Sequence, residues 1–171
     1  MGLDTALKER CESVRIAIVD DHHLAREGLR DMLADEPSFE VVGEAANGRE
    51  ALRLCSRLRP NLIFMDVRMP EMDGLTATRE IKQTYPKISV LMMTMHENPD
   101  YLLEAIKAGA AGYVLKDAPQ HEVTTAVQQV LAGEYPIDAG LATQLLRRLV
   151  TEGERQGNAL RGSHKRGRPY T

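Results

Sequence analysis

Five polar residues could carry chemistry because each stands where a short apolar run of the sequence ends. They comprise three carboxylates, one hydroxyl and one amine: Asp20, Asp21, Asp66, Thr94 and Lys116. If the apolar runs are parallel strands, their carboxyl ends lie along one edge of a sheet, where open α/β folds bind ligands. We therefore expect the five side chains to converge at that edge.

The chemistry of such a group follows from its charges. Crowded carboxylates raise one another's pKa unless a cation lies between them. Mg²⁺ suits a site with few carboxylates, retained waters and an incoming phosphoryl group. A lysine supplies positive charge to phosphoryl oxygens, a threonine donates a hydrogen bond, and an aspartate can act as the nucleophile toward phosphorus. The set predicts phosphoryl transfer to a carboxylate, with metal and lysine neutralising the developing charge.

The apolar runs alternate with amphipathic segments. The runs are Val14–Val19, Phe39–Glu44, Asn61–Met65, Ile88–Met93 and Ala111–Leu115. Their nearly continuous apolar content is typical of parallel strands that are buried on both faces. Strict alternation with helical segments predicts an α/β fold with a doubly wound parallel sheet and right-handed crossovers.

Helix signals lie between and after these runs. A cap residue followed by proline at Asn98-Pro99 predicts a helix start, and Gly109 predicts its end. A further helix is expected from Asp138 to Val150. The resulting division is an N-terminal extension (1–13), a main domain (14–134), a linker helix (135–150) and a disordered basic tail (151–171).

Composition limits the class of protein. The chain has 171 residues, a 43% hydrophobic fraction and a net charge of −3, which predicts no general attraction to nucleic acid or anionic membrane. Cys11 and Cys55 lack a metal-ligand spacing and favour a reducing compartment. The N-terminus is too polar for a signal peptide, and no apolar run reaches the roughly 18 residues that a membrane span needs. We expect a cytoplasmic protein that does not bind membranes.

Four segments resemble the signature segments of two-component receiver domains. They are Ile-Val-Asp-Asp-His (18–22), Phe-Met-Asp-Val-Arg-Met-Pro-Glu-Met-Asp-Gly (64–74), Met-Thr-Met-His (93–96) and Gly-Tyr-Val-Leu-Lys-Asp (112–117). The resemblance covers roughly residues 14 to 133 and is closest to the NarL/FixJ (LuxR-type) subfamily of response regulators. It implies a three-layer, flavodoxin-like fold with five parallel strands in the order 2-1-3-4-5, followed by a linker helix.

The resemblance also implies roles for residues at matching positions. Asp66 would accept a phosphoryl group from a sensor histidine kinase. Asp20 and Asp21 would hold Mg²⁺ together with Asp66, and the backbone carbonyl of Arg68 would complete the protein ligands.

Three further positions match residues that respond to the phosphoryl group in receiver domains. Thr94 and Lys116 would contact that group, and Tyr113 would be the aromatic switch that turns inward when Thr94 moves. The implied protein is a signalling phosphoprotein that regulates transcription, not an enzyme, and it would form a homodimer on phosphorylation.

Two departures from the family pattern stand out. Asp117 follows Lys116, where many receivers have a proline. The subfamily normally carries a helix-turn-helix effector after its linker helix, but only about 20 residues remain here and such a module needs roughly three helices. We expect DNA contact only through that missing effector, in either a shortened regulator or a stand-alone receiver.

Simpler interpretations exist for single residues. Asp21 could cap a helix, Thr94 could merely end a strand, Lys116 could be a solvated surface lysine, and Tyr113 could be half-buried packing. The histidines do not show the spacing of a transition-metal site; they include His22, His23 and His96.

Three other functions compete with the receiver interpretation. A phosphatase of the haloacid dehalogenase type needs a second carboxylate at the position of Arg68. A flavodoxin-like FMN binder needs a phosphate loop where Asp20 and Asp21 stand, and their charges would repel the phosphate. The hypothesis of a DNA-binding tail depends on Lys165–Pro169, which resembles the core of an AT-hook. The preceding segment, Arg161–His164, looks like a vector-derived scar.

Overall fold

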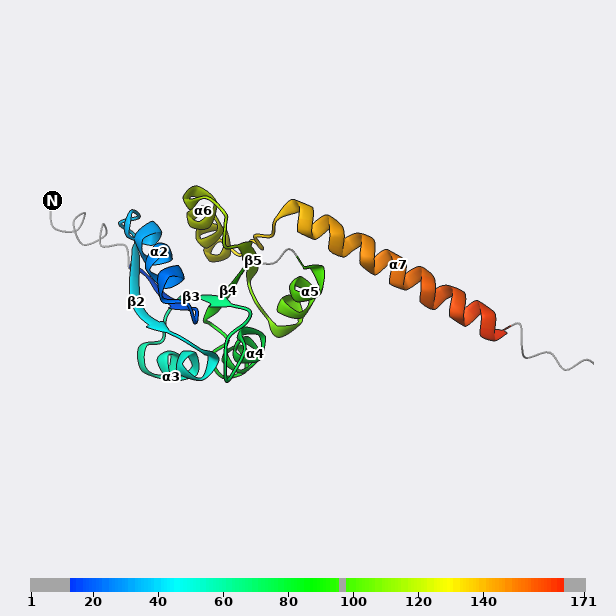
Figure 1. Cartoon of the computed structure of the whole chain (residues 1–171), viewed down its shortest axis with the longest axis horizontal. Coiled ribbons are helices and arrows are strands. Elements are labelled where there is room, and N and C mark those ends of the chain that lie inside the picture. The colour runs from blue at the N-terminus through cyan, green and yellow to red at the C-terminus, as the bar shows by residue number, and fades with distance from the viewer. Residues whose placement is uncertain (1–12, 96–97, 165–171) are drawn as a thin grey trace, which may run out of the picture.

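A computed structural model describes residues 13–95 and 98–164, with side chains as far as residue 157, and its centre is a five-stranded parallel sheet (Figure 1). The strands are β1 (Val14–Val19), β2 (Phe39–Ala45), β3 (Leu62–Asp66), β4 (Ser89–Thr94) and β5 (Gly112–Leu115). Their order is β2-β1-β3-β4-β5, and each neighbouring pair is parallel. The predicted fold class and strand order are confirmed.

Helices cover both faces of the sheet. They are α2 (His23–Ala34), α3 (Gly48–Leu58), α4 (Gly74–Thr84), α5 (Pro99–Ala108), α6 (Gln120–Leu131) and α7 (Ala139–His164). Figure 1 shows α2 and α6 on one face and α3, α4 and α5 on the other. The start of α5 is as the sequence predicted, since the side chain of Asn98 accepts a hydrogen bond from the backbone N–H of Asp100.

The two faces of the sheet carry separate apolar cores. Along β1, Ala17 and Val19 belong to the core beneath α3, α4 and α5, whereas Ile16 and Ile18 belong to the core beneath α2 and α6. Successive side chains of a strand point to opposite faces, so a strand that is covered on both sides must be apolar at every position. This is why the strands read as continuous apolar runs.

The last helix differs from the sequence prediction. Helix α7 runs to His164, so the prediction of a disordered segment from residue 151 is wrong as far as residue 164. Leu141 and Leu145 anchor the helix in the core, and beyond them it extends away from the body (Figure 1). The outer part of the helix covers no surface, so its sequence shows no apolar stripe that would have predicted a helix. It contains glutamate, arginine and glutamine, which are strong helix formers.

Some sequence predictions fall on residues outside the described ranges. These include Cys11, His96 and the basic segment Lys165–Pro169. Among the described residues, no helix has both the length and the apolarity that crossing a membrane would require.

Gly74, the first residue of α4, packs closely against the backbone at the end of β3. Its backbone N–H donates to the carbonyl of Val67 at 2.9 Å, and a Cβ at this position would lie 1.8 Å from the backbone oxygen of Asp66. The backbone of Asp66 cannot move away without breaking strand pairing, because Asp66 pairs with Met93 of β4. The glycine is therefore required for close approach.

We predict that Gly74→Ala lowers the free energy of unfolding by about 3 kcal/mol, the upper end of the usual cost of overpacking. Gly28→Ala is the matched control, because a Cβ at Gly28 in α2 meets nothing within 4 Å. That control should raise the free energy of unfolding by about 0.5–1 kcal/mol through helix propensity. Urea unfolding measures both, and equal effects of the two substitutions would contradict the close approach.

Candidate functional site

The five polar residues singled out in the sequence come from the ends of four strands. Asp20 directly follows β1, Asp66 ends β3, Thr94 ends β4 and Lys116 directly follows β5. Asp20, Asp66 and Thr94 are buried, with exposed fractions of 6%, 8% and 2%. Neighbouring parallel strands end at one edge of the sheet, and this brings together residues that are up to 96 positions apart in the chain.

Lys116 connects the two buried carboxylates. Its Nζ lies 2.5 Å from Oδ2 of Asp20 and 3.2 Å from Oδ2 of Asp66. Its backbone N–H donates to the carbonyl of Thr94 at 2.8 Å, which fixes where the lysine leaves β5. The interpretation of Lys116 as a solvated surface lysine does not hold, since its side chain is only 15% exposed.

Burial and neighbouring charges shift the pKa values of this group. Burial raises the pKa of Asp66; Lys116 opposes that shift, while Asp20 and Asp21 reinforce it. Burial alone would lower the pKa of Lys116, but its hydrogen bond to Asp20 and the charge of Asp66 raise it overall. The ammonium is thus held in its charged form, whereas the carboxylate of Asp66 carries a cost that a second cation would relieve.

Asp21 lies beside this pair with an unsatisfied oxygen. Its Oδ1 is buried and has no hydrogen-bond partner. Helix α2 has His22 at its N-cap position and no side-chain cap, so Asp21 does not serve as a helix cap. Ligand atoms of Asp20, Asp21, His22 and Asp66 all lie within 4.8 Å of one another, which is close enough for one metal ion to contact all four. Sequence spacing did not single out His22.

Thr94 and Tyr113 form a second pair on neighbouring strands. Tyr113 pairs with Met92, two residues before Thr94, and its ring is completely buried rather than half-buried. Burial raises the pKa of its hydroxyl to about 12, and the side chain of Thr94 opposes the shift. The ring lies in the core cluster that also holds Leu102 of α5 and Leu141 of α7, and its role as a switch stays a prediction.

Arg68 lies in the loop after β3, and its side chain turns to α5. Its guanidinium donates to the hydroxyl of Tyr101 and stands 5.2 Å from the centre of that ring. This contact ties the loop that follows Asp66 to the helix that precedes β5. The proposed role of the Arg68 carbonyl as a metal ligand remains a prediction.

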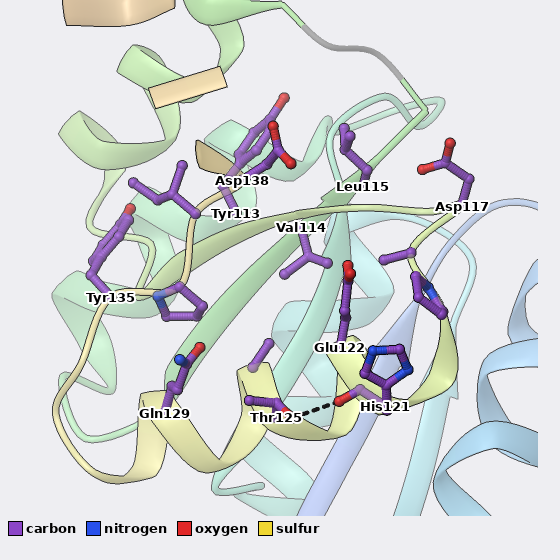
Figure 2. A pocket seen from close by; sticks show the side chains of 15 residues that line it. Tyr113, Val114, Leu115, Asp117, His121, Glu122, Thr125, Gln129, Tyr135 and Asp138 are labelled. Carbon is purple, nitrogen blue, oxygen red and sulfur yellow. Dashed lines mark hydrogen bonds between the residues drawn. The ribbon is translucent and has the colours of Figure 1, made fainter. Parts of the chain in front are cut away.

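The carboxylates of Asp20 and Asp66 border a small pocket. A pocket of about 190 Å³ is lined by Asp20, Asp66 and Lys116 at one end and by apolar side chains of α2 and the strands elsewhere. A larger groove of about 560 Å³ lies between β5, α6 and the segment before α7. Figure 2 shows that groove with Val114 of β5 and Glu122 of α6 in its lining. The larger groove contains none of the predicted site residues except Tyr113.

We predict that, without metal, Asp66→Asn raises the free energy of unfolding at neutral pH. The folded protein raises the pKa of Asp66, so the stability that this group contributes is fully present below its ordinary pKa of 3.8 and is lost as the pH rises through the folded pKa. Asparagine stays neutral at every pH, so the variant does not lose this stability as the pH rises. Urea unfolding in EDTA across pH should show the difference shrinking as the pH falls. A variant less stable than the wild type at neutral pH would contradict the burial cost.

Comparison with known proteins identifies related chains. The family model of the response regulator receiver domain matches residues 16–128. The transcriptional regulatory protein DegU of Brevibacillus brevis is 37% identical over 150 residues, which cover 86% of this chain and 64% of that protein. The response regulator GacA of Pseudomonas aeruginosa is 40% identical over 132 residues, 77% of this chain and 62% of that protein. The chain thus spans somewhat less than two thirds of the length of these relatives.

Solved structures give the same result. A LuxR-family two-component response regulator from Aurantimonas sp. SI85-9A1 has a TM-score of 0.76 and 36% identity, covering 81% of this chain and 99% of that one. The isolated REC domain of RcsB from Salmonella enterica serovar Typhimurium, with the phosphomimetic BeF₃⁻, has a TM-score of 0.72 and 25% identity over 78% and 99%. RcsB dimers bound to DNA match with the same score and identity over 78% of this chain and 68% of that one.

Proposed function

The chain belongs to the response-regulator receiver domain family of NarL/LuxR-type regulators, and on that premise we propose that it accepts a phosphoryl group on Asp66 from a sensor histidine kinase in a Mg²⁺-dependent reaction. The observation that carries the proposal is the convergence of Asp20, Asp66 and Lys116, joined by contacts of 2.5 and 3.2 Å. Receiver domains are signalling proteins, so the product is a modified protein and not a released metabolite.

The donor set fits Mg²⁺. Three carboxylates lie within reach of one ion, and the buried Oδ1 of Asp21 has no hydrogen-bond partner. Oxygen-only ligation at a site that retains waters is the preference of this ion. The carbonyl of Arg68 completes the proposed protein ligands. When bound, Mg²⁺ supplies positive charge to the phosphoryl oxygens and lowers the cost of ionising the three carboxylates.

Each residue then has a defined task. Asp66 attacks phosphorus through a carboxylate oxygen, and the bond from phosphorus to the donor histidine nitrogen breaks as the new bond forms. Lys116 neutralises charge on the transferred group, and it is already placed beside the acceptor oxygen. Thr94 donates a hydrogen bond from its hydroxyl to a phosphoryl oxygen. Tyr113 stays in its inward position once Thr94 has moved toward the phosphate.

The competing activities lack the groups they need. A haloacid-dehalogenase-type phosphatase requires an acid/base two residues after the nucleophile, whereas Arg68 holds that position and its side chain is committed to Tyr101. An FMN phosphate would face the carboxylates of Asp20 and Asp21 at the end of β1. We therefore expect a phosphoprotein without multiple-turnover hydrolysis of small phosphoesters. We place it in the cytoplasm, in keeping with the free, buried thiol of Cys55.

We predict that acetyl phosphate with Mg²⁺ phosphorylates the wild type and that Asp66→Ala abolishes the labelling, as read by intact-protein mass spectrometry. The matched control is Asp31→Asn, which alters an exposed aspartate on α2. Circular dichroism should show that both variants keep the fold. Labelling of Asp66→Ala at the wild-type level would refute the assignment of the acceptor.

We further propose that phosphorylation favours a homodimer and that transcription is controlled through an effector domain beyond the receiver, as the names of the DNA-bound relatives suggest. The surface offers apolar side chains for self-association: Ile106 of α5, Leu131 of α6 and Tyr135 are each 41–48% exposed. DNA contact would belong to the effector, and no membrane contact is proposed.

Beryllofluoride with Mg²⁺ should increase the apparent mass of the protein in gel filtration with light scattering. Leu131→Glu should reduce that increase, because a charge in an apolar interface is costly to bury. Glu134→Gln, a change of one exposed residue nearby, is the control. An unchanged mass with beryllofluoride bound would remove the dimer from the proposal while leaving the phosphoacceptor intact.

A further inference from the structure

We propose that His22 is an additional ligand of the cation site, so that this receiver binds a borderline transition metal such as Co²⁺ through one nitrogen as well as carboxylate oxygens. The inference rests on the proposed function, because it concerns the same ion position. It adds a metal selectivity that carboxylates alone would not give.

The first support is the geometry of the ligand atoms. Nδ1 of His22 lies 3.0 Å from Oδ1 of Asp21 and 3.4 Å from Oδ1 of Asp20. Adjacent ligands of an octahedral ion with bonds of about 2.1 Å are separated by about 3.0 Å, and opposite ligands by about 4.2 Å. The separations of His22 from both aspartates are therefore those of neighbouring ligands around one ion.

The second support is that the close contact between Asp21 and His22 is not a hydrogen bond. Oδ1 of Asp21 is buried and has no hydrogen-bond partner, although Nδ1 of His22 is 3.0 Å away. Asp21 thus has a buried oxygen without a hydrogen bond next to the imidazole of His22. A cation beside both atoms would bind both and would also reach the carboxylate of Asp66.

The backbone keeps the imidazole in place. The N–H of His22 donates to Oδ1 of Asp20 at 2.9 Å, so the residue is fixed to the carboxylate whose ion it would share. Arg26 donates to the backbone oxygen of Asp20 at 2.6 Å and so also holds this turn from α2. The ring itself is 73% exposed, which leaves the ion accessible from solvent.

The ligand type determines the expected selectivity. Mg²⁺ and Mn²⁺ prefer oxygen ligands and gain little from an imidazole, whereas Co²⁺ stands higher in the affinity order for nitrogen-containing sites. A neutral imidazole in the ligand set should therefore strengthen Co²⁺ binding without a comparable effect on Mg²⁺ or Mn²⁺. The adjacent His23 offers a natural comparison, because its Nε2 lies 3.1 Å from Glu27 on the same helix and it is not part of the cluster.

The test compares His22→Ala with the matched control His23→Ala. Affinities for Mg²⁺, Mn²⁺ and Co²⁺ are measured by calorimetric titration, and the visible absorption of bound Co²⁺ reports its ligands. We expect His22→Ala to weaken Co²⁺ binding by about tenfold or more, and to weaken the binding of the oxygen-preferring Mg²⁺ and Mn²⁺ by less than about twofold. The Co²⁺ spectrum should shift in that variant and stay unchanged in His23→Ala.

The outcomes separate this inference from the proposed function. Equal affinities and identical Co²⁺ spectra for the wild type and His22→Ala would overturn the role of His22 while leaving the Mg²⁺ site standing. An equal loss for all three ions would also overturn it, because the histidine would then act only by supporting the aspartates. If the wild type bound neither Mg²⁺ nor beryllofluoride, the proposed function itself would fail.

Discussion

The arrangement of this protein depends on a partly buried lysine that contacts two carboxylates from separate strands. Lys116 contacts Asp20 at 2.5 Å and Asp66 at 3.2 Å. Removing three aspartates from full hydration is costly, and one ammonium offsets only part of that cost. The excess of negative charge makes the strand ends receptive to a divalent cation. The fold therefore holds three carboxylates and only one ammonium together at the strand ends.

The sheet can maintain that arrangement because its interior is rigid. Every strand around the site is apolar on both faces, and the helices on the two sides fill separate cores. Gly74 lets α4 begin directly against the backbone of Asp66, which leaves the acceptor little freedom to move. Close packing of this kind turns a small change in charge at the strand ends into a displacement of whole elements.

Two connections lead from the strand ends toward α5 and α7. Thr94 ends β4 and interacts with Tyr113 of β5, whose buried ring shares a core with Leu141 of α7. Arg68, in the loop after Asp66, binds Tyr101 of α5. On the same surface, Arg148 of α7 lies 2.7 Å from Asp100 of α5. These contacts connect the strand ends through α5 to α7, the helix that leads out of the domain.

The sequence by itself determined the alternating α/β fold and the group of five polar residues, because apolar periodicity and strand-end position are local properties of the chain. The 2-1-3-4-5 strand order came from the resemblance to receiver domains. Local pattern could not determine what depends on distant neighbours. The full burial of Tyr113 needs α5 and α7 to pack over it, and the proximity of His22 to the aspartates depends on how the turn after β1 folds back. The continuation of α7 to His164 could not be predicted from apolar periodicity, because this part of the helix packs on nothing and so needs no apolar face. Tertiary structure decided these features, since each results from contacts between residues that the linear spacing does not relate.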